Sequence, residues 1–452
     1  MQRIDDRVRR GGDEDSLIGS VVDWVMAQAL RDTTIEQLFE GCCLRLRSAG
    51  LPIARGYIAF RTLHPLYSAM GLTWELGNGV KTVGMSHESS ASEEWRRSPF
   101  YFMLSKEIGL LRRRLVGEGA IHDFKLMEEL RDDGYTDVLC YAIHFDQESL
   151  GDTDGRGILG TWSSDIKAGL SDTDIKSLIR VQNRLAVACK VIITSQIAHN
   201  ISTTYLGRNA GQRVLKGQIQ RGDGEKIHAV IWYSDLRNST ALADMMPEED
   251  YLDLLNGYFE STAGAIIDNG GDVLLLIGDA VLGIFPFTDD RTQAETGEMA
   301  VKAAYDALER IKELNACACD NGKCEASFGL GLHVGNVMFG NVGLKDRLTF
   351  SAFGSAVNEV QRLESLTKKF GKPVVASESF KDYCGGDWDA QGEESLKGLS
   401  EKLAVFAPGP KNLARDAASG LSMDRDKVRS EAEEIMLLLQ KAQGNAAERR
   451  VH

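Results

Sequence analysis

The sequence predicts an α+β fold made of two successive units that each mix helices and strands. Stretches with helical periodicity alternate with short apolar runs along the whole chain. Residues 206–223 are polar and rich in Gly, which indicates a division between the units. Beyond this division the predicted elements follow the order β-α-β-β-α-β, which is typical of a ferredoxin-like sheet.

Composition narrows the class of protein. The chain has 452 residues, of which 43% are apolar and 26% charged, as in globular proteins with sizeable cores. The net charge of −14 argues against a nucleic acid partner. We expect no membrane span, because no apolar run approaches the required length. The charged, Gly-rich residues Met1–Asp15 do not resemble a signal peptide. We therefore expect a cytoplasmic protein with reduced thiols.

In the first unit, helices are predicted before and after a set of strands. Apolar residues recur at helical spacing over Ser16–Ala29 and Thr34–Ser48. Ser171 is the expected N-cap of a long helix from Asp172 to about Ile197. Between these helices lie strand-like runs at Ile53–Arg61, Leu72–Leu76, Val138–Phe145 and Gly157–Trp162. This order, with the S-D-T-D start of the last helix, resembles the GAF sensor domain. The resemblance implies that residues 1–205 sense an effector, which the sequence does not identify.

The second unit supplies the β-α-β-β-α-β order. A buried strand is predicted at His228–Leu236 and a helix at Pro247–Asp268. The apolar segment 272–285 is expected to form a hairpin that turns at Gly278 and Asp279. A helix at Glu295–Leu314, a strand at 327–335, a second hairpin ending at Phe353, a helix at Ser355–Lys369 and a strand at 373–377 follow. We therefore divide the chain into residues 1–205, a connector at 206–224, the second unit at 225–408, and a charged helical tail at 409–452.

Two carboxylates indicate the chemistry of the second unit. Asp235 ends the first strand, and Asp279 lies at the tip of the hairpin. In a ferredoxin-like sheet these strands are central neighbours, so we expect both carboxylates at one edge, close enough to share cations. Carboxylate and phosphate oxygens suit Mg²⁺ or Mn²⁺, and a metal pair can activate an attacking oxygen and stabilise a leaving one. The turn Leu236–Thr240, which includes Asn238 and Ser239, would present backbone N–H groups to phosphates.

Residues 225–408 resemble the class III adenylate and guanylate cyclases. The resemblance is carried by SDLRNST, GGDVLLLIGDAV, LHVGNVMFGNVG, FGSAVNEVQRLESLT and LKGLSEKLAVF. It implies that Asp235, Asp279 and the carbonyl of Leu236 bind two metal ions. It also implies that Asn358 orients the ribose, that Arg362 stabilises charge on the α-phosphate, and that Lys397 and Arg347 bind the triphosphate. In this family the two sets of residues come from different subunits, so the resemblance implies a homodimer.

The residues that would recognise the base depart from the family pattern. Adenylate cyclases carry Lys four residues before the second metal Asp and Asp or Thr seven before the Asn, and guanylate cyclases carry Glu and Cys. This chain has Leu275 and Ser351 at these positions. We expect ATP as the substrate, with GTP, CTP or UTP as alternatives. A regulator that binds nucleotides without converting them is the alternative from another functional class.

Two further motifs are interpreted as unrelated to function. Cys317, Cys319 and Cys324 lack paired C-x-x-C spacing, and we expect them in a surface loop between a helix and a strand. The G-G-D-E at Gly11–Glu14 lies before any strand. It therefore does not indicate a diguanylate cyclase, whose motif lies on a central hairpin.

Overall fold

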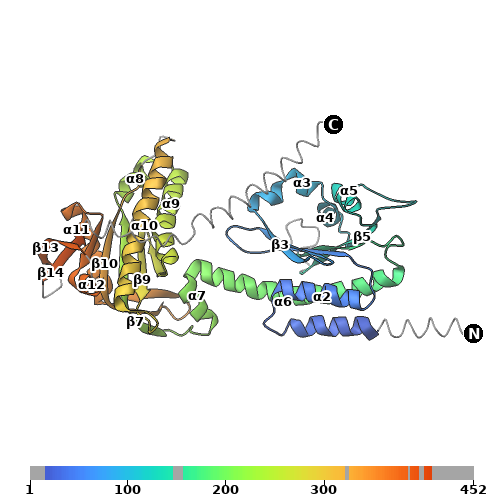
Figure 1. Ribbon diagram of the computed structural model, residues 1–452, viewed down its shortest axis with the longest axis horizontal. Helices are drawn as coiled ribbons and strands as arrows, with labels where there is room; N and C mark the ends of the chain where they lie inside the picture. Colours follow the sequence, from blue (N-terminus) through green and yellow to red (C-terminus); the bar gives the residue numbers. More distant parts are fainter. Residues whose placement is uncertain (1–15, 146–155, 321–324, 385–386, 396–401, 410–452) are drawn as a thin grey trace, which may run out of the picture. The chain divides into compact units, whose positions relative to one another are not determined.

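The computed structural model describes residues 16–145, 156–320, 325–384, 387–395 and 402–409. These residues form two compact units (Figure 1). The N-terminal unit extends to Leu206 and also takes in Gly211–Lys216. The C-terminal unit takes in Gly207–Ala210 and resumes at Gly217. The G-G-D-E motif, Cys324, Lys397 and the expected tail helix lie outside the described residues.

The N-terminal unit is built on an antiparallel sheet with the strand order β3-β2-β1-β6-β5-β4. Its central strand β1 pairs Ala59 with Gly71 of β2 on one side and with Leu159 of β6 on the other. The six strands are β1 (Arg55–Arg61), β2 (Ala69–Glu75), β3 (Gly79–Met85), β4 (Leu110–Arg114), β5 (Asp137–His144) and β6 (Gly157–Ser164).

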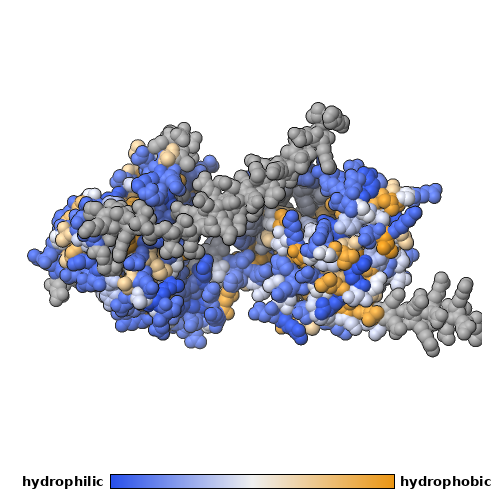
Figure 2. Space-filling model, in the orientation of Figure 1, coloured by the Kyte–Doolittle hydropathy of each residue, from blue (hydrophilic) through white to orange (hydrophobic). Residues whose placement is uncertain are grey.

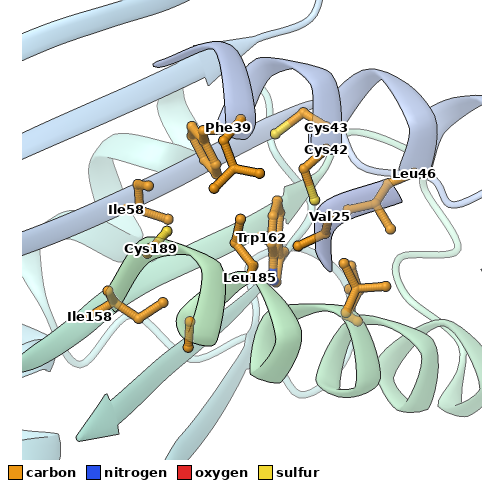
Figure 3. Packing of buried hydrophobic residues seen from close by; sticks show 14 of the residues in the cluster. Val25, Phe39, Cys42, Cys43, Leu46, Ile58, Ile158, Trp162, Leu185 and Cys189 are labelled. Carbon is orange, nitrogen blue, oxygen red and sulfur yellow. The ribbon is translucent and has the colours of Figure 1, made fainter. Parts of the chain in front are cut away.

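Helices cover both faces of this sheet (Figure 1). One face packs against a helix over residues 16–28, α2 (Ile35–Ser48) and α6 (Asp172–Leu206). In that core, Trp162 of β6 packs among Phe39 of α2 and Leu185 of α6 (Figure 3). The other face carries η1 (His87–Ala91), α3 (Glu93–Arg96), α4 (Pro99–Ser105) and α5 (Lys125–Asp132).

The long helix α6 begins where the sequence predicts. The Oγ of Ser171 accepts the backbone N–H of Asp174, whose carboxylate accepts the N–H of Ser171 in return. The helix then continues to Leu206, beyond the expected end near Ile197. Among the described helices, α6 is the one long and apolar enough to cross a membrane by length and composition. The same properties are found in core helices of soluble proteins.

The N-terminal elements predicted from apolar runs are present, but two strands were not predicted. In β3, the middle residues Lys81–Val83 are exposed, so the strand has no buried face to produce an apolar pattern. In β4, three consecutive Arg residues obscure the apolar pattern, because ion pairs hold the strand in addition to the burial of Leu111. Arg112 and Arg114 both pair with the fully buried carboxylate of Asp137, and Arg113 pairs with Asp123.

The C-terminal unit is an eight-stranded sheet in the order β13-β14-β12-β10-β7-β9-β8, with β11 paired to β10. As predicted, the first strand and the first hairpin are central neighbours, since β7 lies between β10 and β9. The strands are β7 (Gly224–Leu236), β8 (Asp272–Ile277), β9 (Ala280–Pro286), β10 (Phe328–Gly343), β11 (Leu348–Phe353), β12 (Val374–Ser377), β13 (Trp388–Ser395) and β14 (Lys402–Pro408).

Alternation along the central strands separates two faces of this sheet. Trp232 of β7 and Leu330 of β10 join a core with α9 (Glu248–Asp268), α10 (Gln293–Asp320) and α12 (Glu378–Cys384). The opposite face packs against α11 (Ser355–Phe370), whose Leu363 contacts Val375 of β12. Polar residues dominate the face of this unit seen in Figure 2, with apolar residues at intervals.

Two segments differ from the sequence interpretation. We expected Cys317 and Cys319 in a loop, but α10 runs to Asp320 and contains both, since the Ala and Cys residues there are compatible with a helix. The segment expected to connect the units contains a short helix, α7 (Arg208–Leu215), and β7 begins at Gly224.

Candidate active site

The two predicted carboxylates lie together at one edge of the C-terminal sheet. Asp235 pairs with Ala280, the first residue of β9, so the end of β7 lies beside the hairpin tip that carries Asp279. The N–H of Leu236 donates to the carbonyl of Asp279 at 3.4 Å, which fixes this contact through the backbone. Asp235 is half-buried and Leu236 is buried. The topology therefore brings together carboxylates that are 44 residues apart in the sequence.

The carboxylate pair is electrostatically unfavourable without a cation. Burial, followed by the negative charge of Asp279, raises the pKa of Asp235 to about 6. The positive charge of Lys368 lowers this pKa but does not outweigh the other two effects. A divalent cation between the carboxylates would relieve their repulsion.

A third carboxylate, from Glu364 of α11, lies behind this pair and was not predicted. Glu364 is buried, and its pKa is raised by burial and by the charge of Asp235. The hydroxyl of Thr367 donates to its Oε1 at 3.4 Å. The sequence offered one sign of Glu364, a charged residue on the otherwise apolar face of α11. In the structure it lies opposite two Gly residues of β10, which leave space for its side chain. Gly329 is one of these, and it pairs directly with Asp235.

The predicted turn after β7 leads into a short helix, α8 (Ser239–Met245). Asn238 precedes this helix in the left-handed region, with φ of 57°. Asn tolerates this conformation better than most residues with a side chain, which accounts for its position at the sharp turn. Ser239 and Thr240 form the first turn of α8. The turn therefore starts at the edge of the sheet that carries Asp235.

The predicted pair on α11 faces away from the carboxylates. Asn358 is exposed and Arg362 is half-buried, and both lie one turn apart on the side of α11 opposite Val360 and Glu364. Among the described residues of one chain, no hydrogen bond or ion pair joins Asn358 or Arg362 to Asp235 or Asp279. A single chain thus holds the two sets of predicted residues apart.

The two positions expected to read the base lie on adjoining strands. Leu275 is on β8 and Ser351 is on β11, and these strands contact each other. The pairing of β8 with β9 shifts register between Val273 and Leu275, which indicates a bulge just before Leu275. Both side chains are half-buried. Arg347 is exposed in the turn between β10 and β11.

The donor chemistry of this edge fits a hard divalent metal. Asp235 and Asp279 supply carboxylate oxygens, and Leu236 supplies a backbone carbonyl at the same place. Within the described residues, no group of three or more His, Cys, Asp or Glu side chains is placed to hold a metal ion. The remaining ligands would therefore come from the backbone, the substrate or water.

The comparison with a known protein family concerns the C-terminal unit. Residues 224–406 match the family described as adenylate and guanylate cyclase catalytic domain. The C-terminal unit is the part of the chain that is similar to this cyclase family. The match begins at residue 224 and does not include residues 1–205. The resemblance of those residues to the GAF domain therefore remains a prediction.

Two curated relatives are named as adenylate cyclases. The chain is 29% identical over 193 residues to an adenylate cyclase of Dictyostelium discoideum described as terminal-differentiation specific, covering 42% of this chain and 9% of that protein. It is 27% identical over 178 residues to adenylate cyclase 1 of Rhizobium meliloti, covering 38% and 26%. The chain thus spans less than a third of the length of these relatives. A solved structure, the adenylyl cyclase CyaB from P. aeruginosa, is 21% identical with a TM-score of 0.37, covering 41% of this chain and 94% of that one.

Proposed function

We propose that this protein is a nucleotide cyclase that converts ATP to 3′,5′-cyclic AMP and pyrophosphate. The observation that carries the proposal is the placement of Asp235 and Asp279 side by side at the end of β7. In the reaction, the ribose 3′-oxygen forms a bond to the α-phosphorus while the bond to the pyrophosphate oxygen breaks. The 3′-hydroxyl proton leaves to solvent.

Asp235, Asp279 and the Leu236 carbonyl would hold two Mg²⁺ or Mn²⁺ ions. When bound, such ions lower the pKa of the 3′-hydroxyl and neutralise charge on the departing pyrophosphate. The chain itself contributes positioning and electrostatic stabilisation. Arg362 offers a planar, permanently charged guanidinium to the α-phosphate, and Asn358 orients the ribose through its amide. Lys397, Arg347 and the turn Asn238–Thr240 would bind the triphosphate.

The active form we propose is a homodimer, because one chain keeps the two sets of residues apart. A second copy would bring its Asn358 and Arg362 to the carboxylates of the first, which gives two equivalent sites. An exposed apolar surface supports such an assembly in the C-terminal unit. This hairpin surface comprises exposed residues of β8, β10, β11 and the adjoining turn, namely Leu276, Ile277, Met338, Val342, Leu344 and Phe353.

The helix α6 supports a dimer independently. Its exposed side includes Val187, Val191 and Ile201, with exposed fractions of 48%, 49% and 40%. Together with other exposed positions, these residues follow alternate steps of four and three, which is the spacing of a coiled-coil seam. We define this α6 stripe as Val187, Val191, Thr194, Ala198, Ile201 and Tyr205. Pairing of two α6 helices would bury it, which also accounts for the apolar character of α6.

We further propose that the N-terminal unit regulates the cyclase unit. A change in the N-terminal unit would alter the pairing or twist of the α6 helices and so the fit of the two half-sites. Removing residues 1–205 would then change the rate of cyclisation while leaving the carboxylate site intact. An unchanged rate in a truncated dimer would contradict regulation by this unit.

The decisive experiment is a cyclisation assay with ATP, GTP, CTP and UTP in the presence of Mn²⁺, with products identified by mass. We expect cyclic AMP as the main product, and its loss in Asp279→Asn. Asp289→Asn, which removes an exposed carboxylate elsewhere, is the matched control. A cyclic product from GTP, CTP or UTP would support a nucleotide cyclase with a substrate other than ATP. No product from any nucleotide would favour a regulator that only binds nucleotides.

Mixing two inactive variants tests the shared site. In an equimolar mixture of Asp279→Asn and Arg362→Ala chains, half of the dimers carry one intact site. About a quarter of the wild-type rate should therefore return. Each variant alone should stay inactive. A mixture that remains inactive while heterodimers form would contradict a site shared between subunits.

A further inference from the structure

The N-terminal unit contains a cavity of about 190 Å³ that the cyclase chemistry does not use. Its floor is the face of the sheet opposite α2 and α6, and its roof consists of residues from α3 and α4. The cavity lies entirely within the described residues of this unit. Its walls include Tyr57, Ala59, Ala69, Trp95, Phe100 and Leu159.

Small residues on the central strands create this space. Ala59 of β1 and Ala69 of β2 both line the floor, and each side chain is a single methyl group. Protein interiors are usually closely packed, but the large side chains of Trp95 and Phe100 line this space without filling it. The space is therefore built into the sequence of the sheet.

Two polar side chains of the wall make no hydrogen bond among the described residues, the hydroxyl of Tyr57 and the imidazole of His144. The hydroxyl of Tyr57 lies near Gly71, since a Cβ on that glycine would be 3.0 Å from it. Among the described residues no hydrogen bond is made by this hydroxyl, and burial raises the pKa of Tyr57 to about 12, which keeps it protonated. Arg61, the permanently charged residue of the wall, is already committed to another interaction in the protein.

We propose that this cavity binds a small, uncharged aromatic molecule with one hydrogen-bonding group, which meets the hydroxyl of Tyr57. Aromatic walls favour a planar ring, and no Asp, Glu or Lys side chain is among the described lining residues, so a buried cation would have no carboxylate to pair with. An apolar cavity of roughly 150 Å³ accepts benzene, so about 190 Å³ suits a ring of that size or a compact fused pair. The proposal concerns binding in the N-terminal unit alone and does not depend on the cyclase reaction.

Indole and indene provide a matched pair of probes, because they share a shape but only indole carries an N–H donor. We expect the full-length protein to bind one indole per chain saturably in calorimetric titration. Ala59→Leu, which fills the floor, should weaken both probes by at least about tenfold. Ala168→Leu, at an exposed position of the same unit, is the control.

Tyr57→Phe tests the hydrogen bond separately, since it removes the hydroxyl and keeps the ring. Wild-type protein should prefer indole to indene by about fivefold, as a net hydrogen bond allows, and Tyr57→Phe should abolish the preference without weakening indene. This comparison also stands if Ala59→Leu fails to fold. Three results would overturn the proposal: no saturable binding of either probe, wild-type binding by folded Ala59→Leu, or an indole preference that persists in Tyr57→Phe.

Discussion

The carboxylate of Glu364 occupies the space that a side chain at Gly329 would need. A Cβ on Gly329 would lie 2.1 Å from Oε1 of Glu364 and 2.5 Å from the hydroxyl of Thr367. Gly329 pairs with Asp235 across the sheet, so this close approach lies directly beside the predicted metal site. The position of α11 over the sheet is therefore coupled to the position of Asp235.

Gly329→Ala should destabilise the protein and distort the site. The new methyl group would force the buried side chains or β10 to move, and such overpacking costs about 2 kcal/mol. We expect a matching loss in the free energy of unfolding, measured by urea denaturation, and at least a tenfold loss of cyclase activity. Gly19→Ala is the control, because a Cβ there meets nothing within 4 Å and Ala favours a helix. Wild-type stability of Gly329→Ala would show that α11 is not held so closely.

The raised pKa of Asp235 predicts a pH-dependent stability in metal-free protein. Since this pKa is about 6, above the ordinary value of 3.8, the contribution of Asp235 to folding is fully favourable below about pH 4 and is lost as the pH rises through 6. Asp279→Asn removes the repulsion. In EDTA at pH 8 it should raise the free energy of unfolding by about 1 kcal/mol, a modest value because Asp235 is half-exposed. At pH 4 the gain should vanish.

The same variant separates metal binding from charge repulsion. Millimolar Mn²⁺ should raise the unfolding midpoint of the wild type at pH 8, because a ligand that binds the folded state stabilises it. Asp279→Asn should lose most of this shift, whereas Asp289→Asn should keep it. Equal shifts in all three proteins would place the bound ion elsewhere. A gain in stability at pH 4 as large as that at pH 8 would contradict the electrostatic explanation.

The sequence predicted the central sheet well because each element there has its own local signal. The buried run of β7, the turn at Gly278 and the apolar periodicity of α11 are visible without tertiary information. It also predicted that Asp235 and Asp279 would meet, since topology alone brings their strands together. The missed elements depend on other forces: β4 is held by ion pairs to Asp137, and β3 has no buried middle.

Glu364 was not predicted as part of the site, because its position also depends on contacts between elements that are distant in the sequence. Glu364 lies on an apolar helix face, where a sequence pattern predicts only core packing. Glu364 can lie close to Asp235 because Gly329, on β10, has no side chain in the space that Glu364 occupies. This relationship is apparent only in the three-dimensional structure. The cavity beside Tyr57 likewise depends on residues of different strands, Ala59 of β1, Ala69 of β2 and Leu159 of β6, that meet on one face of the sheet.

Base preference should follow the residues at positions 275 and 351. Leu275 offers no hydrogen bond, so wild-type discrimination between ATP and GTP should be weak at this position. Leu275→Glu with Ser351→Cys, the guanylate cyclase pattern, should raise the GTP-to-ATP ratio of kcat/KM by at least about tenfold. Leu275→Lys with Ser351→Asp, the adenylate cyclase pattern, should move the ratio in the opposite direction. Equal ratios in both double variants would show that other groups read the base.

The α6 stripe should determine how strongly two chains associate. Val191→Asp places a charge in the middle of the stripe, where pairing would bury it against its symmetry mate. We expect the dimer to dissociate at least tenfold more readily in sedimentation equilibrium, with a parallel loss of cyclase activity at low protein concentration. Gln196→Asp, at an exposed position of α6 outside the stripe, should leave both unchanged. Equal association of the two variants would exclude the stripe as an interface, and a protein that enters solution only with detergent would assign α6 to a membrane instead.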